Sequence, residues 1–289
     1  MTKEREGELL MLGLALLESW FPILSIVAMS YIGALHTYTY SLIIALAFFI
    51  AIMAKRKRFA ELKNKEAYKD LLLTSFWITL LFTLVFTGMQ YTTAGNMAVI
   101  IFLQLLFSYL YFNVFGKEKM DTIHFLGAVI MGIGALIILF PEELTLNKGD
   151  LLILVAAAIA PIANLYQKRA RIFCSSETIL GFRTVAGLPF IAFMAWYFEP
   201  TTTYKGWISA LPYLLLIGIL IYVVSKIMWI EALHRTSITK ISAMMGLVPM
   251  MTLFFAYIYL DEVPEFRQIL GIIPVLVGGY LLTKPIKAS

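Results

Sequence analysis

The sequence predicts an all-α polytopic membrane protein with ten transmembrane helices, arranged as two inverted five-helix repeats. Three observations carry this fold class: a very apolar composition, ten long apolar runs joined by short polar loops, and a motif that recurs at a fixed distance. Of the 289 residues, 61% are hydrophobic and only 14% are charged, whereas soluble domains carry about 25% charged residues. With a mean hydropathy of +0.85, lipid is the expected solvent.

Each predicted helix is an apolar run long enough to cross a membrane. A hydrocarbon core of about 30 Å requires roughly 20 helical residues. The runs that qualify are 9–33, 36–54, 70–89, 94–115, 121–140, 149–167, 176–198, 207–231, 237–260 and 265–283. They lack the alternation of apolar and polar residues that is typical of membrane β-barrel strands.

The distribution of basic residues predicts the orientation of these helices. Seven Lys and Arg residues lie in "KRKRFAELKNKEAYKD" after the second run, and three lie in "QKRAR" after the sixth. The loops "GALHT" and "YTTAGN" on the other side contain none. Because Lys and Arg mark cytoplasmic loops, both termini are predicted to be cytoplasmic, in a prokaryotic cytoplasmic membrane. Topology thus accounts for the net charge of +5, and nucleic acid is not an expected partner.

The chain also repeats itself. Residues 92–141 align without a gap on residues 236–285, at a constant offset of 144. The offset pairs Thr92 with Thr236, Glu118 with Glu262, Gly127 with Gly271, Gly134 with Gly278 and Pro141 with Pro285. The predicted repeats are residues 1–141 and 142–289. Because five helices per repeat is an odd number, the second repeat must be inverted in the membrane, which is typical of secondary transporters.

In this arrangement the sequence resembles the drug/metabolite transporter superfamily, and specifically its EamA-type members. The resemblance covers nearly the whole chain. It implies a cavity between helices one to four and six to nine, with helices five and ten peripheral, and a monomer or a homodimer formed through those two helices. A family proline in the fourth helix of a repeat matches Pro249, and a family arginine in the second matches Arg183. The first repeat departs from both patterns.

Three charged side chains lie inside the predicted helices: Glu18, Arg183 and Lys226. Glu18 is about 14 Å from the cytoplasmic start of its helix, at 1.5 Å per residue, which is near the membrane midplane. A carboxylate there should face the bundle interior or a hydrated cavity, where it would bind a proton or a cationic substrate. The alternatives are a structural ion pair with Arg183 or Lys226, or a neutral acid bonded to a backbone carbonyl.

The two cations lie closer to the cytoplasmic side. Arg183 and Lys226 are each within about two turns of that surface, and long basic side chains can extend to the headgroups. We favour this interpretation for Lys226. For Arg183, the resemblance adds a role in the pocket or in tying helices together.

Prolines and polar or aromatic residues complete the candidate site. Pro22 and Pro161 occupy similar places in the first helix of each repeat, and with Pro249 they are predicted kink or gating positions, although prolines also occur in static bundles. The candidate substrate- or proton-binding residues are Glu18, Ser19, Trp20, Trp77, Gln90, Asn96, Asn164, Arg183, Tyr222 and Trp229. Ser25, Tyr40, Gln104 and Tyr166 are further candidates, and aromatic rings near helix ends also form interfacial belts.

The sequence contains no motif for a metal site, a disulfide framework or an enzyme. The three histidines are scattered and the one cysteine is Cys174, so neither a metal site nor a disulfide framework is predicted. The sequence has no phosphate-binding loop and no nucleophile elbow, so we expect neither an enzyme nor a cofactor. We predict a proton-coupled secondary transporter that exports a small metabolite (an amino acid, an amine or a drug-like compound) by alternating access. A membrane sensor or scaffold of the same fold and a facilitative channel remain alternatives.

Overall fold

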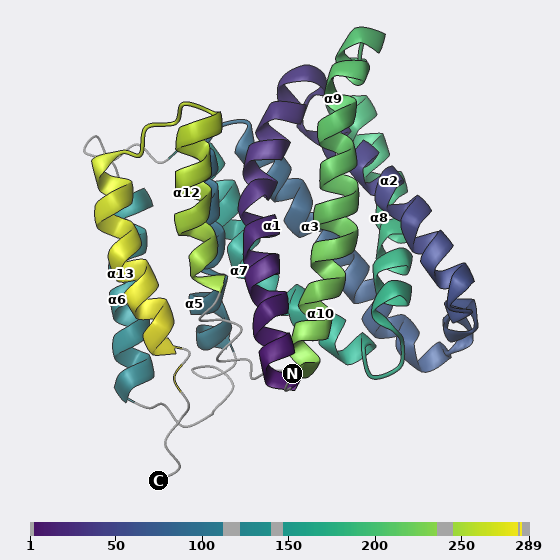
Figure 1. The fold of residues 1–289 in the computed structure, drawn as a ribbon, viewed down its shortest axis with the longest axis horizontal. Coiled ribbons are helices and arrows are strands. Elements are labelled where there is room, and N and C mark those ends of the chain that lie inside the picture. Colours follow the sequence, from purple (N-terminus) through teal and green to yellow (C-terminus); the bar gives the residue numbers. More distant parts are fainter. Residues whose placement is uncertain (1–2, 112–121, 140–146, 236–244, 283, 285–289) are drawn as a thin grey trace.

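The computed structural model describes residues 3–111, 122–139, 147–235, 245–282 and 284, and the regular elements within them are all helices (Figure 1). In the first part of the chain these are α1 (Lys3–Ile32), α2 (Ala34–Lys55), η1 (Arg58–Lys63), η2 (Lys65–Ala67), α3 (Tyr68–Met89), α4 (Ala94–Phe102), α5 (Gln104–Tyr109) and α6 (Thr122–Leu139). They are followed by α7 (Lys148–Ala170), α8 (Ser176–Phe198), α9 (Tyr204–Leu216), η4 (Ile217–Ser225), α10 (Lys226–Arg235), α12 (Leu247–Tyr259) and α13 (Phe266–Leu282).

Six of the described helical stretches have the length and composition of membrane spans. They are Leu9–Ile32, Ala34–Lys55, Lys65–Met89, Lys148–Ala170, Ser176–Phe198 and Tyr204–Trp229. Four shorter apolar helical stretches are Ala94–Tyr109, Thr122–Ile138, Leu247–Tyr259 and Phe266–Leu282. Every apolar run predicted from the sequence thus contains a described helix. The all-α membrane fold predicted from the sequence is confirmed at this level.

The stretch Tyr204–Arg235 is helical throughout but not uniformly α-helical. Between α9 and α10, the nine residues of η4 form a π-helix. A π-helix has wider turns than an α-helix, and such segments are frequent at functional sites. Hydropathy does not reveal this irregularity, because every residue of η4 apart from Gly218 and Ser225 is apolar or aromatic.

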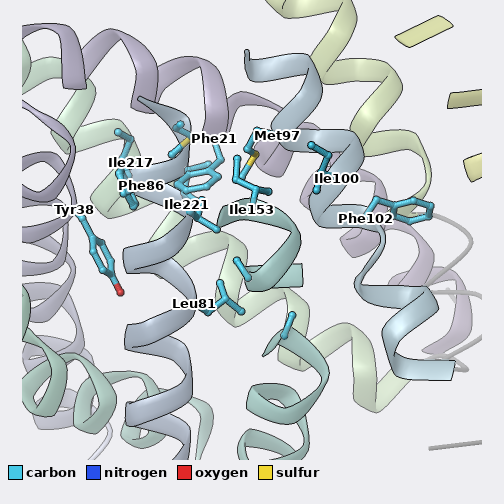
Figure 2. Close-up of a cluster of buried hydrophobic side chains, with 14 of the residues drawn as sticks. Phe21, Tyr38, Leu81, Phe86, Met97, Ile100, Phe102, Ile153, Ile217 and Ile221 are labelled. Atoms are coloured by element: carbon cyan, nitrogen blue, oxygen red, sulfur yellow. The ribbon is translucent and has the colours of Figure 1, made fainter. Parts of the chain in front are cut away.

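The helices of the bundle pack mainly in pairs. α3 packs against α7, and α1 packs against the continuous stretch α9–η4–α10. α2 pairs with α8, α4 with α12, and α6 with α13. Figure 2 shows the largest buried cluster, in which Phe21, Phe86 and Ile221 lie close together. These three residues come from α1, α3 and η4, so the core joins the first and second halves of the chain.

The α6–α13 pair is held together by glycines. A Cβ atom on Gly278 would lie 2.5 Å from the carbonyl oxygen of Gly127, and one on Gly271 would lie 2.9 Å from that of Gly134. Only glycine permits such an approach of two backbones. The order of the contacts, with the earlier residue of α6 against the later residue of α13, makes the two helices antiparallel.

The two ends of the bundle differ in what they contain. The N-terminus lies at the lower end in Figure 1, which we call the N-terminal face, and η1, η2 and the turn between α7 and α8 lie at this face. The other end, the distal face, holds the turn between α1 and α2 and the loop between α12 and α13. The α1–α2 turn takes a single residue, Gly33, whose φ of 87° is in the left-handed region.

Candidate functional site

A cavity of about 170 Å³ lies at the centre of the bundle. It is bounded by α1, α3, α4, α5, α7, α8, α10 and α12, and so by helices from both halves of the chain. On α7, which starts at the distal face, it reaches as far as Gln167, three residues from the helix end. On α12 it reaches Val248, next to the helix start. The cavity therefore extends from the middle of the bundle toward the N-terminal face.

An ion pair crosses this cavity from α1 to α10. The Nζ atom of Lys226 donates a hydrogen bond to Glu18 Oε1 at 2.6 Å, and the Ser225 hydroxyl donates to the same oxygen. The side chains of Glu18 and Lys226 are 15% and 20% exposed. The interpretation that Lys226 extends to the lipid headgroups is therefore wrong. Lys226 directly follows the π-helix, and Ser225 and Lys226 both contact α1 from this position.

Arg183 lies on another wall of the cavity and is only 8% exposed. Its Nη1 atom donates to the side-chain oxygen of Gln167 at 3.0 Å, which connects α8 to α7. Among the described residues, no carboxylate forms an ion pair with this guanidinium. Arg183 also lines a second, much smaller space of about 10 Å³, together with Tyr38 and Tyr222.

Four further candidates from the sequence line the central cavity: Pro22, Gln104, Asn164 and Trp229. Pro161 and Pro249 are buried, and each directly follows a lining residue, Ala160 and Val248 respectively. These residues, together with the ion pair and Arg183, come from six different elements. The lining also includes Gln167, Phe21 and Phe82, which our reading of the sequence did not single out.

Several candidates lie away from the cavity and pack helices together. The Ser19 hydroxyl donates to the carbonyl of Leu16 in its own helix at 2.7 Å, and the Ser19 carbonyl accepts from Thr252 of α12. Trp20 stacks on Phe255 with 4.6 Å between ring centroids. Trp77 contacts the ring of Phe76.

Tyr222, the next candidate, lies within the buried core. Its ring is 5.5 Å from that of Phe82 and 6.0 Å from that of Tyr38, measured between centroids. It therefore belongs to an aromatic group from η4, α3 and α2 that lines the small space.

Asn96 belongs to a buried polar network at the distal face. Its side-chain amide donates to Asp150 Oδ2 at 3.2 Å and accepts from Gln268 Nε2 at 2.7 Å. Asp150 also accepts from the Thr92 hydroxyl. Asp150 and Gln268 are 3% and 4% exposed. The network joins α4 in the first half of the chain to α7 and α13 in the second half.

Two further carboxylates at the distal face cap helices of the first half. Glu199, which follows α8, accepts from the amides of Leu35 and His36 at the start of α2, at 2.8 and 2.9 Å. Gln90 is exposed here and donates to Glu199 at 3.3 Å. Glu262, which follows α12, accepts from the amide of Ala94 at the start of α4 at 3.1 Å. Carboxylates at helix N-termini satisfy unpaired amides and complement the helix dipole, so these bonds join the two halves of the chain at the distal face.

The N-terminal face has a related contact outside the cavity. Glu61 in η1 accepts from the amide of Ser175 at 2.6 Å and from the Thr178 hydroxyl at 2.8 Å, and thereby caps α8. Burial alone would raise the pKa of the Glu61 carboxyl, but these hydrogen bonds and the nearby Arg58 outweigh burial and lower that pKa. Next to it, Arg56 pairs with Glu177.

The arrangement has no feature of a metal centre or of a nucleophilic catalyst. In the part of the chain that the structure describes, no three His, Cys, Asp or Glu side chains come together as metal ligands. What the cavity offers instead is a set of hydrogen-bonding and charged groups on apolar helices. Fold and site together define an integral membrane protein with an internal small-molecule cavity.

Comparison with known proteins identifies the family of the chain. The model of the EamA-like transporter family matches residues 5–140 and again residues 147–284. The chain therefore belongs to the EamA-like transporter family, whose members are transporters rather than enzymes. A protein of Archaeoglobus fulgidus, described as an uncharacterized transporter, is 26% identical over 71% of this chain and 72% of its own. The uncharacterized transporter YoaV of Bacillus subtilis is 25% identical over 83% of each chain. One crystal structure superposes with a TM-score of 0.67 over 96% of both chains at 15% identity, which shows a shared fold.

Proposed function

We propose that this protein is a secondary active transporter that moves a small metabolite outward across a prokaryotic cytoplasmic membrane by alternating access, with proton coupling. The observation that carries the proposal is a central cavity that lies between helices of both halves, contains an ion pair and Arg183, and extends toward the N-terminal face, while hydrogen bonds join the two halves at the distal face. A facilitative channel would require a continuous path, so these bonds across the distal face favour alternating access.

The proposed architecture is ten crossing helices in two inverted repeats, residues 1–141 and 142–289. The α6–α13 contacts support it, because the sequence offset of 144 converts the pair Gly127–Gly278 into the pair Gly271–Gly134, which is also in contact. The helix pairs support it in the same way: α3 with α7 corresponds to α9–η4–α10 with α1. The family model also matches the chain twice in succession.

The proposed orientation places the N-terminal face in the cytoplasm. The basic segment 55–69 and the basic end of α7 both lie at this face, as the positive-inside rule requires. The cavity then extends toward the cytoplasm in this conformation, where it would take up a substrate for export. The relatives in an archaeon and a bacterium support a prokaryotic cytoplasmic membrane.

Proton coupling is assigned to Glu18. In this conformation Lys226 and Ser225 both donate to its carboxylate. Protonation of Glu18 would remove the charge that holds Lys226 and would separate α1 from α10 in this part of the cavity. A group whose proton affinity differs between two conformations couples a proton gradient to transport, because only differential affinity shifts a conformational equilibrium.

The proposed oligomeric state is a monomer or a homodimer. Apolar residues of α6 and α13 are exposed on the outside of this pair, among them Phe125, Leu126, Ile269 and Ile273. Lipid covers this surface in a monomer. In a homodimer formed through α6 and α13, the fifth and tenth predicted helices, a second copy would cover it.

The test is substrate counterflow in proteoliposomes containing the purified full chain. Vesicles loaded in turn with amino acids, amines and drug-like compounds are screened for exchange, with and without an imposed pH gradient. We expect saturable exchange that accelerates with internal substrate and responds to the gradient. Flux that is linear with concentration and indifferent to internal substrate would show a channel and refute the proposal.

A further inference from the structure

The central cavity carries an unbalanced positive charge. Among its described lining residues, Lys226 and Arg183 are basic and Glu18 is the one acid. Because Lys226 Nζ lies 2.6 Å from the Glu18 carboxylate, these two charges neutralise each other. One positive charge, that of Arg183, is left facing the cavity.

Arg183 is buried without the partner that such a charge requires. A guanidinium has five N–H donors, and the hydrogen bond recorded for Arg183 within the described residues is the one to the neutral amide oxygen of Gln167 at 3.0 Å. Burial of a charge is costly unless an opposite charge compensates it. A link between α7 and α8 alone would be made at lower cost by two neutral side chains.

A second unused donor lies beside it. Tyr222 is 2% exposed, and its hydroxyl has no hydrogen-bond partner in the described part of the chain. Tyr222 and Arg183 line the same small space of about 10 Å³, next to the central cavity. Because Tyr222 does not line the central cavity itself, the donors that face a ligand there are those of the Arg183 guanidinium that Gln167 leaves unused.

We infer that Arg183 binds the carboxylate of the transported substrate, with Gln167 fixing the guanidinium, so that the substrate class is small organic acids with an apolar body. This inference rests on the proposed function. Arginine suits the role because its planar donors match the two oxygens of a carboxylate. A single carboxylate restores neutrality, whereas a phosphate monoester of charge near −2 would leave a negative excess.

The body of the substrate lies against the remaining wall. Phe21, Phe82 and Ile78 line the cavity beside the polar groups, and such apolar and aromatic surfaces supply most of the contact area in small-molecule sites. An amine at the same position would face the uncompensated charge of Arg183 and would be repelled. The site therefore selects acids over amines of the same shape.

Three compounds of one shape test this selection: 3-phenylpropionate, 3-phenylpropionamide and 3-phenylpropylamine. Each is titrated into the purified full chain in nanodiscs at pH 7, with heat of binding and thermal unfolding as readouts. We expect the carboxylate to bind and to raise the unfolding temperature, and the amide and amine to bind at least about tenfold more weakly, since charge-assisted bonds are about twice as strong as neutral ones. Absence of binding by the carboxylate, or equal binding by the amide, overturns the inference.

Two variants assign the binding to Arg183. Gln167→Glu places a carboxylate where Arg183 Nη1 already has a partner at 3.0 Å, so we expect a folded protein of equal or higher unfolding temperature that no longer binds 3-phenylpropionate. Arg183→Lys keeps the charge but loses the paired donors, and should bind about tenfold more weakly. Arg169→Gln, at an exposed position on α7, is the matched control and should bind normally. Unchanged binding by Gln167→Glu overturns the inference.

A transport assay distinguishes failure of this inference from failure of the proposed function. If 3-phenylpropionate binds through Arg183 but is not moved in proteoliposomes, the carboxylate subsite stands and the transport proposal fails. If the chain instead transports an amine, with the same rate in Arg183→Lys as in wild type, transport stands and the carboxylate subsite fails.

Discussion

The distal face and the central cavity both bury carboxylates between the two halves of the chain, but they give them different partners. At the distal face, Glu199 and Glu262 accept from backbone amides of α2 and α4. In the cavity, Glu18 accepts from the long, flexible side chain of Lys226. A backbone amide is fixed at its helix end, whereas a lysine ammonium can move to another partner. The distal bonds therefore set helix positions, and in the proposed mechanism the Glu18–Lys226 pair is the contact that a proton or a ligand replaces.

The largest expected effect comes from breaking the ion pair between Glu18 and Lys226 in the cavity. Glu18→Gln leaves Lys226 without its counter-charge, and the loss of one partner of a buried ion pair costs on the order of 3 kcal/mol. We expect a lower thermal unfolding temperature and loss of the response to an imposed pH gradient. Lys226→Gln should impair transport as well, because it leaves Glu18 unpaired.

The control for this pair is the double variant Glu18→Gln/Lys226→Gln, in which neither charge is left alone. We expect it to recover most of the unfolding temperature while still lacking pH-dependent flux. If Glu18→Gln alone unfolds at the wild-type temperature and transports normally at every pH, the Glu18–Lys226 pair contributes neither to stability nor to proton coupling.

An intermediate effect is expected at the distal face. Glu262→Gln weakens the cap on α4, and loss of a helix cap costs about 1 kcal/mol, or roughly a fivefold shift in favour of conformations that open this face. Ala98 lines the cavity on α4, so Ala98→Cys in a Cys174→Ala background reports the opening. A membrane-impermeant maleimide should label it about fivefold faster from the distal side when Glu262→Gln is present.

The matched control is Glu265→Gln, an exposed acid in the same loop. Labelling should not change in this variant. If both substitutions change labelling equally, then the charge of the loop, and not the cap on α4, holds the distal face closed.

The smallest effect concerns Glu61, which caps α8 at the N-terminal face. Because the folded state lowers the pKa of this carboxyl, its contribution to stability is present above the pKa of the unfolded chain and is lost as pH falls through the lower pKa of the folded protein. Wild type and Glu61→Gln should thus differ in unfolding temperature at pH 7 and converge below about pH 4. A difference that persists at low pH would contradict the charge-based account.

Hydropathy was sufficient to predict an all-helical membrane fold, because a membrane requires long apolar runs whatever they pack against. It also placed Glu18 in the interior, since a carboxylate near the middle of such a run cannot extend to water. The pair with Lys226 was one of the alternatives considered for Glu18, but the favoured interpretation, in which Lys226 extends to the headgroups, was wrong. Lys226 lies 208 residues further along the chain, and it follows a π-helix that no apolar periodicity reveals.

The polar network at the distal face shows the same limit. Asn96 was a candidate for the substrate site, but its partners Asp150 and Gln268 are 54 and 172 residues away in the sequence. A single sequence gives no measure of such contacts. A usable signal was present in Asp150, an acid in the first turn of α7, because an acid at that position is favoured by the helix dipole.

The π-helix η4 has a geometric consequence for the residues that follow it. A π-helical turn accommodates an additional residue compared with an α-helical turn, and one residue of an α-helix corresponds to a rotation of about 100°. If η4 returned to α-helical geometry, α10 would rotate about its own axis relative to α9, by about 100° for each additional residue that the π-helical turns accommodate. Lys226 is the first residue of α10, so this rotation would turn its side chain away from α1. A change of winding in nine residues would then break the pair with Glu18 without any shift of the helix axis.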